Sequence, residues 1–267
     1  METRQILHHD GAHLNYWLSR PGGAKQSLVM LHGVASNHTR WSEFVTHSRL
    51  TASWNLLRPD LRGNGDSVFH GRINRSRWVA DLKAIMDHEA LPRVVLLGHS
   101  LGAEIALDFA AAYPDNVAGL VLIDPVFHKN LHGVLGWVRR LRYVLWIPVG
   151  LLSLANALGL RRRHYPPRDM YALDEKTRAT LRSTPGMKIA DLYINPLADL
   201  SYISLANYMQ DVLAVVQPVP ELEAIDQPVL ALMSRGSSLS DRHRNETLVR
   251  RMPNASIRIV DCDHWPL

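Results

Sequence analysis

The sequence contains little cysteine and no repeat, and each absence excludes a class of protein. Cys262 is the only cysteine among 267 residues, so an internal disulfide is excluded and the paired spacing of a zinc site is missing. The N-terminal stretch METRQILHHDG holds acidic and basic residues and no apolar run, so no secretory signal is visible. We therefore expect a cytoplasmic protein without a metal site.

Charge and glycine patterns exclude two further classes. The chain has 30 Lys and Arg against 25 Asp and Glu, a net charge of +5, but the basic residues are spread over many segments with two local clusters. That distribution is weak support for nucleic-acid binding, and we expect no such partner. The triplet Gly63-Asn64-Gly65 lacks the third glycine and the helix start of a dinucleotide site. We expect no cofactor.

The most informative stretch that is present runs from Arg93 to Tyr113, RVVLLGHSLGAEIALDFAAAY. It predicts a buried strand, a turn containing the pattern G-x-S-x-G, and a helix with apolar residues at helical spacing. This combination is typical of a nucleophile elbow, which exposes a serine on a sharp bend above a sheet. The glycines at 98 and 102 avoid crowding where strand and helix approach closely. The alternative is that Ser100 simply caps an ordinary helix.

The remaining pattern predicts strands that alternate with helices. The pair Asp10-Gly11 predicts a hairpin. Expected strands are 27–31, 54–58, 94–97, 118–123, 228–233 and 256–260, with helices at 39–50, 74–89 and 241–251. This order favours an α/β fold, a mostly parallel sheet with helices on both faces. Residues 126–227 show helical patterns and no convincing strand, so we expect a core of residues 1–125 and 228–267 and an inserted helical lid at 126–227.

The order of four motifs carries a family resemblance. They are His32-Gly33, the segment RPDLRGNGDS at 58–67, GHSLG at 98–102, and His264 in the segment DHWPL. In these motifs and their order the chain resembles a serine hydrolase of the α/β-hydrolase superfamily, similar to its esterases and lipases. The resemblance spans nearly the whole chain.

The resemblance implies roles for individual residues. Ser100 is the expected nucleophile, and His264 is the expected base that accepts its proton. The expected oxyanion hole consists of the backbone N–H groups of Val34 and Leu101. His32 would stabilise the loop before Val34.

The acid behind the base has two candidates. The family usually places an aspartate two or three residues after a turn glycine, but here the first carboxylate after Gly236 is Asp241. Asp241 also fits a capping-box pattern, from Ser238, that opens the next helix. Asp124, at the end of the preceding strand, is the alternative, because some family members supply the acid there. We favour Asp241 over Asp124.

The expected lid contains a long uncharged run. Residues 143–160, YVLWIPVGLLSLANALGL, carry no charge and lie between the basic clusters 139–142 and 161–163. One interpretation is two lid helices that cover the site and form an apolar acyl pocket. The other is a lid that contacts an anionic membrane surface.

A serine at the elbow favours acyl transfer to water. We expect a hydrolase of small carboxylic esters with an apolar acyl or alcohol group, acting through an acyl-enzyme. The motifs also fit a carbon–carbon bond hydrolase, a cofactor-free haloperoxidase-like enzyme, or a non-catalytic ligand-binding protein on the same fold. The oligomeric state is left open.

Overall fold

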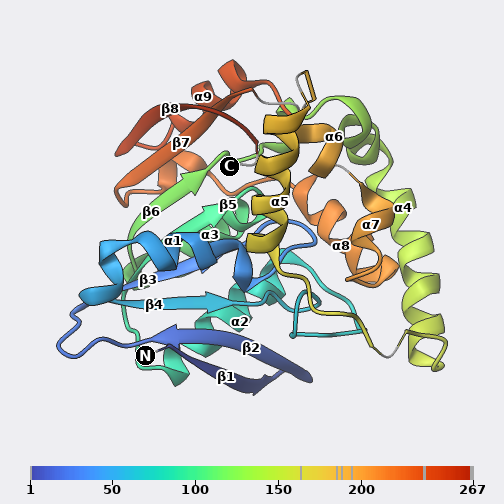
Figure 1. Cartoon of the computed structure of the whole chain (residues 1–267), viewed down its shortest axis with the longest axis horizontal. Helices are drawn as coiled ribbons and strands as arrows, with labels where there is room; N and C mark the ends of the chain where they lie inside the picture. Colours follow the sequence, from blue (N-terminus) through green and yellow to red (C-terminus); the bar gives the residue numbers. More distant parts are fainter. Residues whose placement is uncertain are drawn as a thin grey trace.

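The computed structural model describes residues 2–162, 164–184, 186–187, 189–193, 195–236 and 239–264. Within these residues the strands form one eight-stranded sheet in the order β1-β2-β4-β3-β5-β6-β7-β8 (Figure 1). The strands are β1 Glu2–His9, β2 Ala12–Ser19, β3 Gln26–Leu31, β4 Trp54–Pro59, β5 Val94–His99, β6 Val117–Ile123, β7 Val229–Gly236 and β8 Ala255–Asp263. Strand β2 pairs antiparallel with β1 and β4, and the other pairs are parallel. The expected mostly parallel sheet is confirmed.

The expected hairpin at Asp10-Gly11 joins β1 and β2. Both residues have positive φ, 44° and 71°, as a tight two-residue turn of the twisted kind requires. His9 pairs directly with Ala12 across the turn. The hairpin prediction is confirmed.

The helices differ from expectation at two places, the first of them at residues 39–50. They are α1 Ser42–His47, α2 Arg75–His88, α3 Leu101–Ala112, α4 Gly133–Ala157, α5 Met170–Ser183, α6 Ile189–Tyr193, α7 Pro196–Asp199, α8 Leu205–Val215 and α9 Arg242–Val249. The single helix expected at 39–50 is wrong, because α1 is flanked by separate 3₁₀ turns at 38–41 and 49–52. Ser48 causes the break: its backbone is extended, and its hydroxyl accepts a hydrogen bond from Leu50 N–H.

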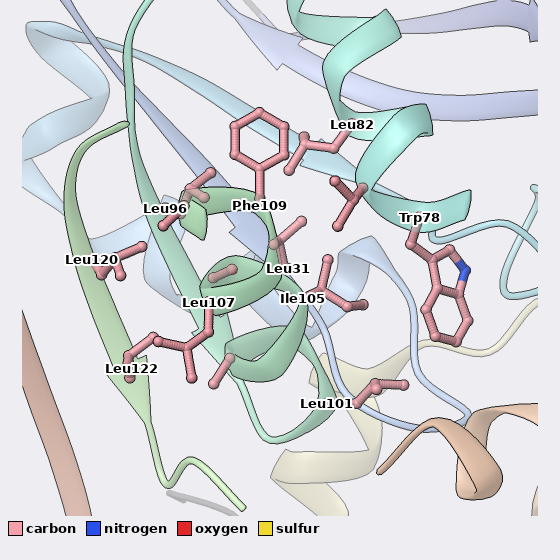
Figure 2. Close-up of a cluster of buried hydrophobic side chains, with 14 of the residues drawn as sticks. Leu31, Trp78, Leu82, Leu96, Leu101, Ile105, Leu107, Phe109, Leu120 and Leu122 are labelled. Carbon is pink, nitrogen blue, oxygen red and sulfur yellow. The ribbon is translucent and has the colours of Figure 1, made fainter. Parts of the chain in front are cut away.

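Alternate residues of the central strands enter two apolar clusters on opposite faces of the sheet. Val29 and Leu31 of β3 join a cluster with α2 and α3, whereas Leu28 and Met30 join a second cluster with Trp41. Figure 2 shows part of the first cluster, with labelled side chains from α2 and α3 and from the strands β3, β5 and β6. Helices on both faces of the sheet are therefore confirmed.

Between β6 and β7 the described residues form helices α4 to α8. Helix α4 is one continuous helix of 25 residues at the edge of the molecule (Figure 1), so the expectation of two helices over 143–160 is wrong. Pro148 lies inside it and removes one backbone hydrogen bond. Packing against α8, with Val149 buried, holds the helix through this position. The division into a core and a lid at 126–227 stays a prediction.

In the part of the chain that the structure describes, no helix has the length and apolar character needed to cross a membrane.

Candidate active site

Ser100 lies on a strained turn between β5 and α3. Its φ is 54° and its ψ is −119°, a backbone conformation that few non-glycine residues adopt. A Cβ on Gly102 would lie 2.2 Å from the Leu31 carbonyl oxygen, and one on Gly98 would lie 2.3 Å from the Gly102 oxygen. Both neighbours are backbone atoms that cannot move aside, so both positions require glycine. Ser100 occupies the N-cap position of α3, yet its side chain makes no capping hydrogen bond.

The Ser100 hydroxyl instead faces His264, 164 positions later in the sequence. The distance from His264 Nε2 to Ser100 Oγ is 3.1 Å. His264 follows β8 and is 2% exposed. Its carbonyl oxygen accepts a hydrogen bond of 2.8 Å from the His99 Nε2–H. Burial, followed by the nearby His264, lowers the pKa of His99 to about 3, so His99 is neutral and positions the loop that carries His264.

Asp124 is the carboxylate that contacts His264. Its Oδ2 forms a hydrogen bond with His264 Nδ1, and its Oδ1 accepts from Ser234 N–H at 3.1 Å and from Ser234 Oγ–H at 2.9 Å. Burial by itself raises the pKa of Asp124, but the hydrogen bonds from His264 and Ser234 outweigh it and hold the pKa below its ordinary value. The imidazole therefore lies between a hydroxyl and an ionised carboxylate.

Asp241, the favoured acid in the sequence interpretation, does not contact His264 through any hydrogen bond or ion pair of the described residues. Its carboxylate caps α9 by accepting from Arg244 N–H at 3.1 Å, and 42% of its side chain is exposed. The preference for Asp241 as the partner of His264 is thus corrected in favour of Asp124. Asp241 does cap the helix, but as the N-cap residue itself and not as the fourth residue of a box opened by Ser238, which lies outside the described residues.

The expected oxyanion-hole residues both neighbour Ser100: Leu101 follows it in the chain and Val34 lines the same cavity, while the role of their N–H groups stays a prediction. Leu101 is the first residue of α3, so its N–H has no acceptor within the helix. A Cβ on Gly33 would lie 3.4 Å from Ser100 Cβ, so the loop entering Val34 lies against the serine. His32 holds this loop: its Nε2 accepts from Leu61 N–H at 3.0 Å, and burial lowers its pKa to about 4.

Ser100 and His264 line a cavity of about 550 Å³. Much of its wall is apolar, including Leu135 and Val138 of α4 and Val212 and Val215 of α8. A cavity of this size suits a small organic ligand.

The two arginines in the cavity wall are paired with carboxylates. Arg40 Nη1 lies 2.8 and 2.6 Å from the two oxygens of Asp174, and Arg168 Nη1 lies 2.7 Å from Asp199 Oδ1. Their charges are largely balanced within the protein.

A family model described as alpha/beta hydrolase fold matches residues 26–267. The chain belongs to the α/β-hydrolase family. Among the described residues of this α/β-hydrolase, no group of three or more His, Cys, Asp or Glu side chains could hold a metal ion.

The curated relatives match only part of the α/β-hydrolase chain. The lipase LipV of Mycobacterium tuberculosis is 35% identical over 105 residues, which is 39% of either chain. The 2-hydroxy-6-oxo-2,4-heptadienoate hydrolase of Pseudomonas putida is 35% identical over 107 residues, again 39% of either chain. The chain thus spans well under half the length of each. A thermophilic esterase of Thermogutta terrifontis superposes with a TM-score of 0.68 over 99% of this chain and 92% of the esterase, at 21% identity, a likeness of fold alone.

Sequence reasoning missed one of the buried carboxylates of this α/β-hydrolase, Asp211. Asp211 of α8 is fully buried, and its Oδ2 accepts from Ala35 N–H at 3.2 Å. Ala35 follows Val34 and has a positive φ of 48°. Asn64 Nδ2 donates to Asp211 Oδ1 at 3.4 Å. The sequence signal was three polar residues at helical spacing, Asn207, Gln210 and Asp211, which together line the buried side of α8.

Asp211 makes the folded α/β-hydrolase sensitive to pH. Burial raises its pKa to about 7, and the hydrogen bonds from Ala35 and Asn64 offset this only in part. Because the folded-state pKa lies above the ordinary value of 3.8, folding favours the protonated acid. The contribution of protonated Asp211 to the free energy of unfolding is fully present below the ordinary pKa. It decreases as the pH rises toward 7 and is gone above the folded-state pKa.

Replacing Asp211 by asparagine is therefore expected to raise the melting temperature at pH 8 by roughly 5 °C or more, with little difference at pH 4. The new amide oxygen keeps the Ala35 bond. The new NH₂ group faces Asn64 Nδ2, itself a donor, so the Asn64 amide turns over and accepts through Oδ1, which has no partner among the described residues. Thermal unfolding followed by circular dichroism at pH 4, 6 and 8 measures this. Asp211→Ala is the control and should lower the melting temperature at every pH. An Asp211→Asn effect of equal size at pH 4 and pH 8 would contradict the assignment.

Proposed function

We propose that this protein is a serine hydrolase that cleaves carboxylic esters through an acyl-enzyme. One observation carries the proposal: the hydrogen-bonded series Asp124, His264 and Ser100 ends in a hydroxyl that lines an apolar cavity. This is the arrangement in which a weak nucleophile is activated by a base that an acid orients. The cytoplasmic location expected from the sequence stays a prediction.

The reaction proceeds in two steps. Ser100 Oγ attacks the ester carbonyl carbon while His264 Nε2 takes the hydroxyl proton, and the oxygen's negative charge is held by the N–H groups of Val34 and Leu101. The tetrahedral intermediate expels the alcohol, which leaves with the proton from His264. Water then attacks the acyl-enzyme, gives a proton to His264, and releases the acid while Ser100 recovers its proton. Asp124 keeps the imidazole oriented and stabilises its protonated form.

The cavity wall supports an apolar acyl or alcohol group on a small-molecule ester. The apolar side chains of α4 and α8 would bury such a group, at roughly 0.8 kcal/mol for each CH₂ removed from water. A substrate carboxylate would have to displace Asp174 from Arg40 or Asp199 from Arg168, because these guanidinium groups are already paired. Neutral esters are therefore preferred.

Cleavage of a carbon–carbon bond is the second candidate. The partial match to the Pseudomonas putida heptadienoate hydrolase favours it. The named substrate of that relative is a carboxylate, and the paired arginines of the present cavity count against such a substrate.

A series of p-nitrophenyl esters of increasing acyl length tests the proposal. We expect kcat/KM to rise by up to about fourfold for each added CH₂ until the cavity is filled. A 2-hydroxy-6-oxo-dienoate run beside the series tests the second candidate, and we expect its turnover to be at least 100-fold lower. Equal, slow rates for every ester, or faster turnover of the dienoate, would contradict ester hydrolysis as the main activity.

A further inference from the structure

The outer side of α4 is an exposed apolar surface. Large apolar side chains recur every three or four residues, so they lie on one side of the helix, and each is at least 48% exposed: Trp137, Leu141, Val144, Ile147, Leu151 and Leu154. The opposite side of α4 packs against the protein through Leu145 and Val149. These six side chains lie between positions 137 and 154, so the surface is roughly 26 Å long. Contiguous exposed apolar surfaces of this kind mark contacts with proteins or membranes. We name these six residues the α4 face.

The charge around the α4 face has one sign. Between Asp124 and Asp169 the sequence has eight of its 30 Lys and Arg residues and none of its Asp or Glu residues. The rest of the chain holds 22 basic and 25 acidic residues, a net charge of −3, although the whole protein carries +5. The guanidinium of Arg140 lies 5.7 Å from the ring centre of Trp137, and Arg161 and Arg162 are exposed beyond the other end of α4. Positive charge thus borders the apolar surface at both ends.

We propose that the α4 face docks on an anionic lipid surface. An apolar helix side enters the boundary between headgroups and acyl chains, and arginines beside it attract negatively charged headgroups. The same helix contributes Val134, Leu135 and Val138 to the wall of the cavity. The docking goes beyond the proposed ester hydrolysis, since it requires neither Ser100 nor turnover.

The charges favour a lipid surface over a second copy of the chain. In a parallel pair of α4 helices Arg140, which lies beside Trp137 of the α4 face, would face its own counterpart. In an antiparallel pair Arg140 would lie toward the end of the partner helix that is followed by Arg161 and Arg162. Helix α4 has no carboxylate to balance either arrangement. An anionic bilayer supplies the opposite charge along the entire helix.

Flotation with vesicles tests the docking. The probes are phosphatidylcholine vesicles with and without about one third phosphatidylglycerol. We expect the wild type to float with the anionic vesicles at low salt, and the bound fraction to fall steeply at 0.5 M NaCl, because exposed charges are screened. We expect little binding to phosphatidylcholine alone. Ser100→Ala should bind as the wild type does, which separates this test from the proposed hydrolysis.

Substitutions on the α4 face supply the decisive comparison. The triple variant Trp137→Glu, Ile147→Glu, Leu151→Glu should reduce vesicle partitioning at least tenfold while its melting temperature stays near that of the wild type. The matched control is Ile6→Glu, at a 51% exposed apolar position on β1, which should bind normally. Absence of wild-type binding at low salt, or equal binding by the triple variant, would overturn the proposal. A dimer seen by light scattering and abolished by the triple variant, without vesicle binding, would assign the α4 face to a second copy instead.

Discussion

Replacing Ser100 by alanine is expected to lower kcat for ester hydrolysis by about 10⁵- to 10⁶-fold, because no other group can form the acyl-enzyme. The hydroxyl makes no capping bond to α3, so its removal should change the melting temperature by less than about 2 °C. Steady-state kinetics on a p-nitrophenyl ester, with a burst-phase measurement on the wild type, provide the readout. The burst should vanish in the variant.

Ser36→Ala is the matched control for this experiment. Ser36 lines the same cavity, and its buried hydroxyl has no hydrogen-bond partner among the described residues. We expect its kcat to stay within about threefold of the wild type. A ligand-binding protein without catalysis would behave differently: the wild type itself would turn over negligibly, and ligand affinity would survive Ser100→Ala. Equal hydrolysis by Ser100→Ala and the wild type would remove the proposed nucleophile.

Replacing Asp124 by asparagine is expected to lower kcat by about 10⁴-fold. An amide facing His264 Nδ1 can no longer stabilise the imidazolium, and its N–H group favours the wrong tautomer of the ring. The amide oxygen can still accept from Ser234, so the fold should persist. Kinetics at pH 8, with circular dichroism as the check on folding, measure the effect.

Asp241→Asn is the comparison that makes this result specific. Asparagine caps a helix about as well as aspartate does, so the stability of α9 should be kept. The side chain of Asp241 contacts Arg244, is 42% exposed and makes no bond to His264 within the described residues, so we expect kcat within about twofold of the wild type. If Asp241→Asn were instead the more damaging change, the Asp124 contact with His264 would not be the catalytic one.

Sequence reasoning located correctly those positions where the local backbone geometry permits only one type of residue. The glycines at 98 and 102 are required because backbone atoms lie where a side chain would start, and that requirement is visible in the pentapeptide itself. The apolar runs on either side predict β5 and α3 for the same local reason. The hairpin was predicted from its turn residues, and the strands were predicted from apolar runs that alternate with helical segments.

The missed or reversed positions depend on contacts far along the chain. One exception is local: the expected helix at 39–50 divides because the Ser48 hydroxyl accepts a hydrogen bond from Leu50 N–H. Helix α4 continues through Pro148 because α8 packs against it. Asp211 lies on the buried side of α8, and its importance comes from the Ala35 N–H, 176 positions away. No local pattern reports such a contact.

The sequence alone determined the type of fold, the strained serine turn and the late histidine, because each rests on spacing and residue type within a short stretch. Only the tertiary structure decided which aspartate meets that histidine. Asp124 and Asp241 both follow strands whose carboxyl ends lie at the same edge of the sheet, so the order of residues leaves both within reach. The choice comes from hydrogen bonds. The carboxylate of Asp241 accepts from the Arg244 N–H of α9, whereas the bonds from Ser234 orient the carboxylate of Asp124 toward His264.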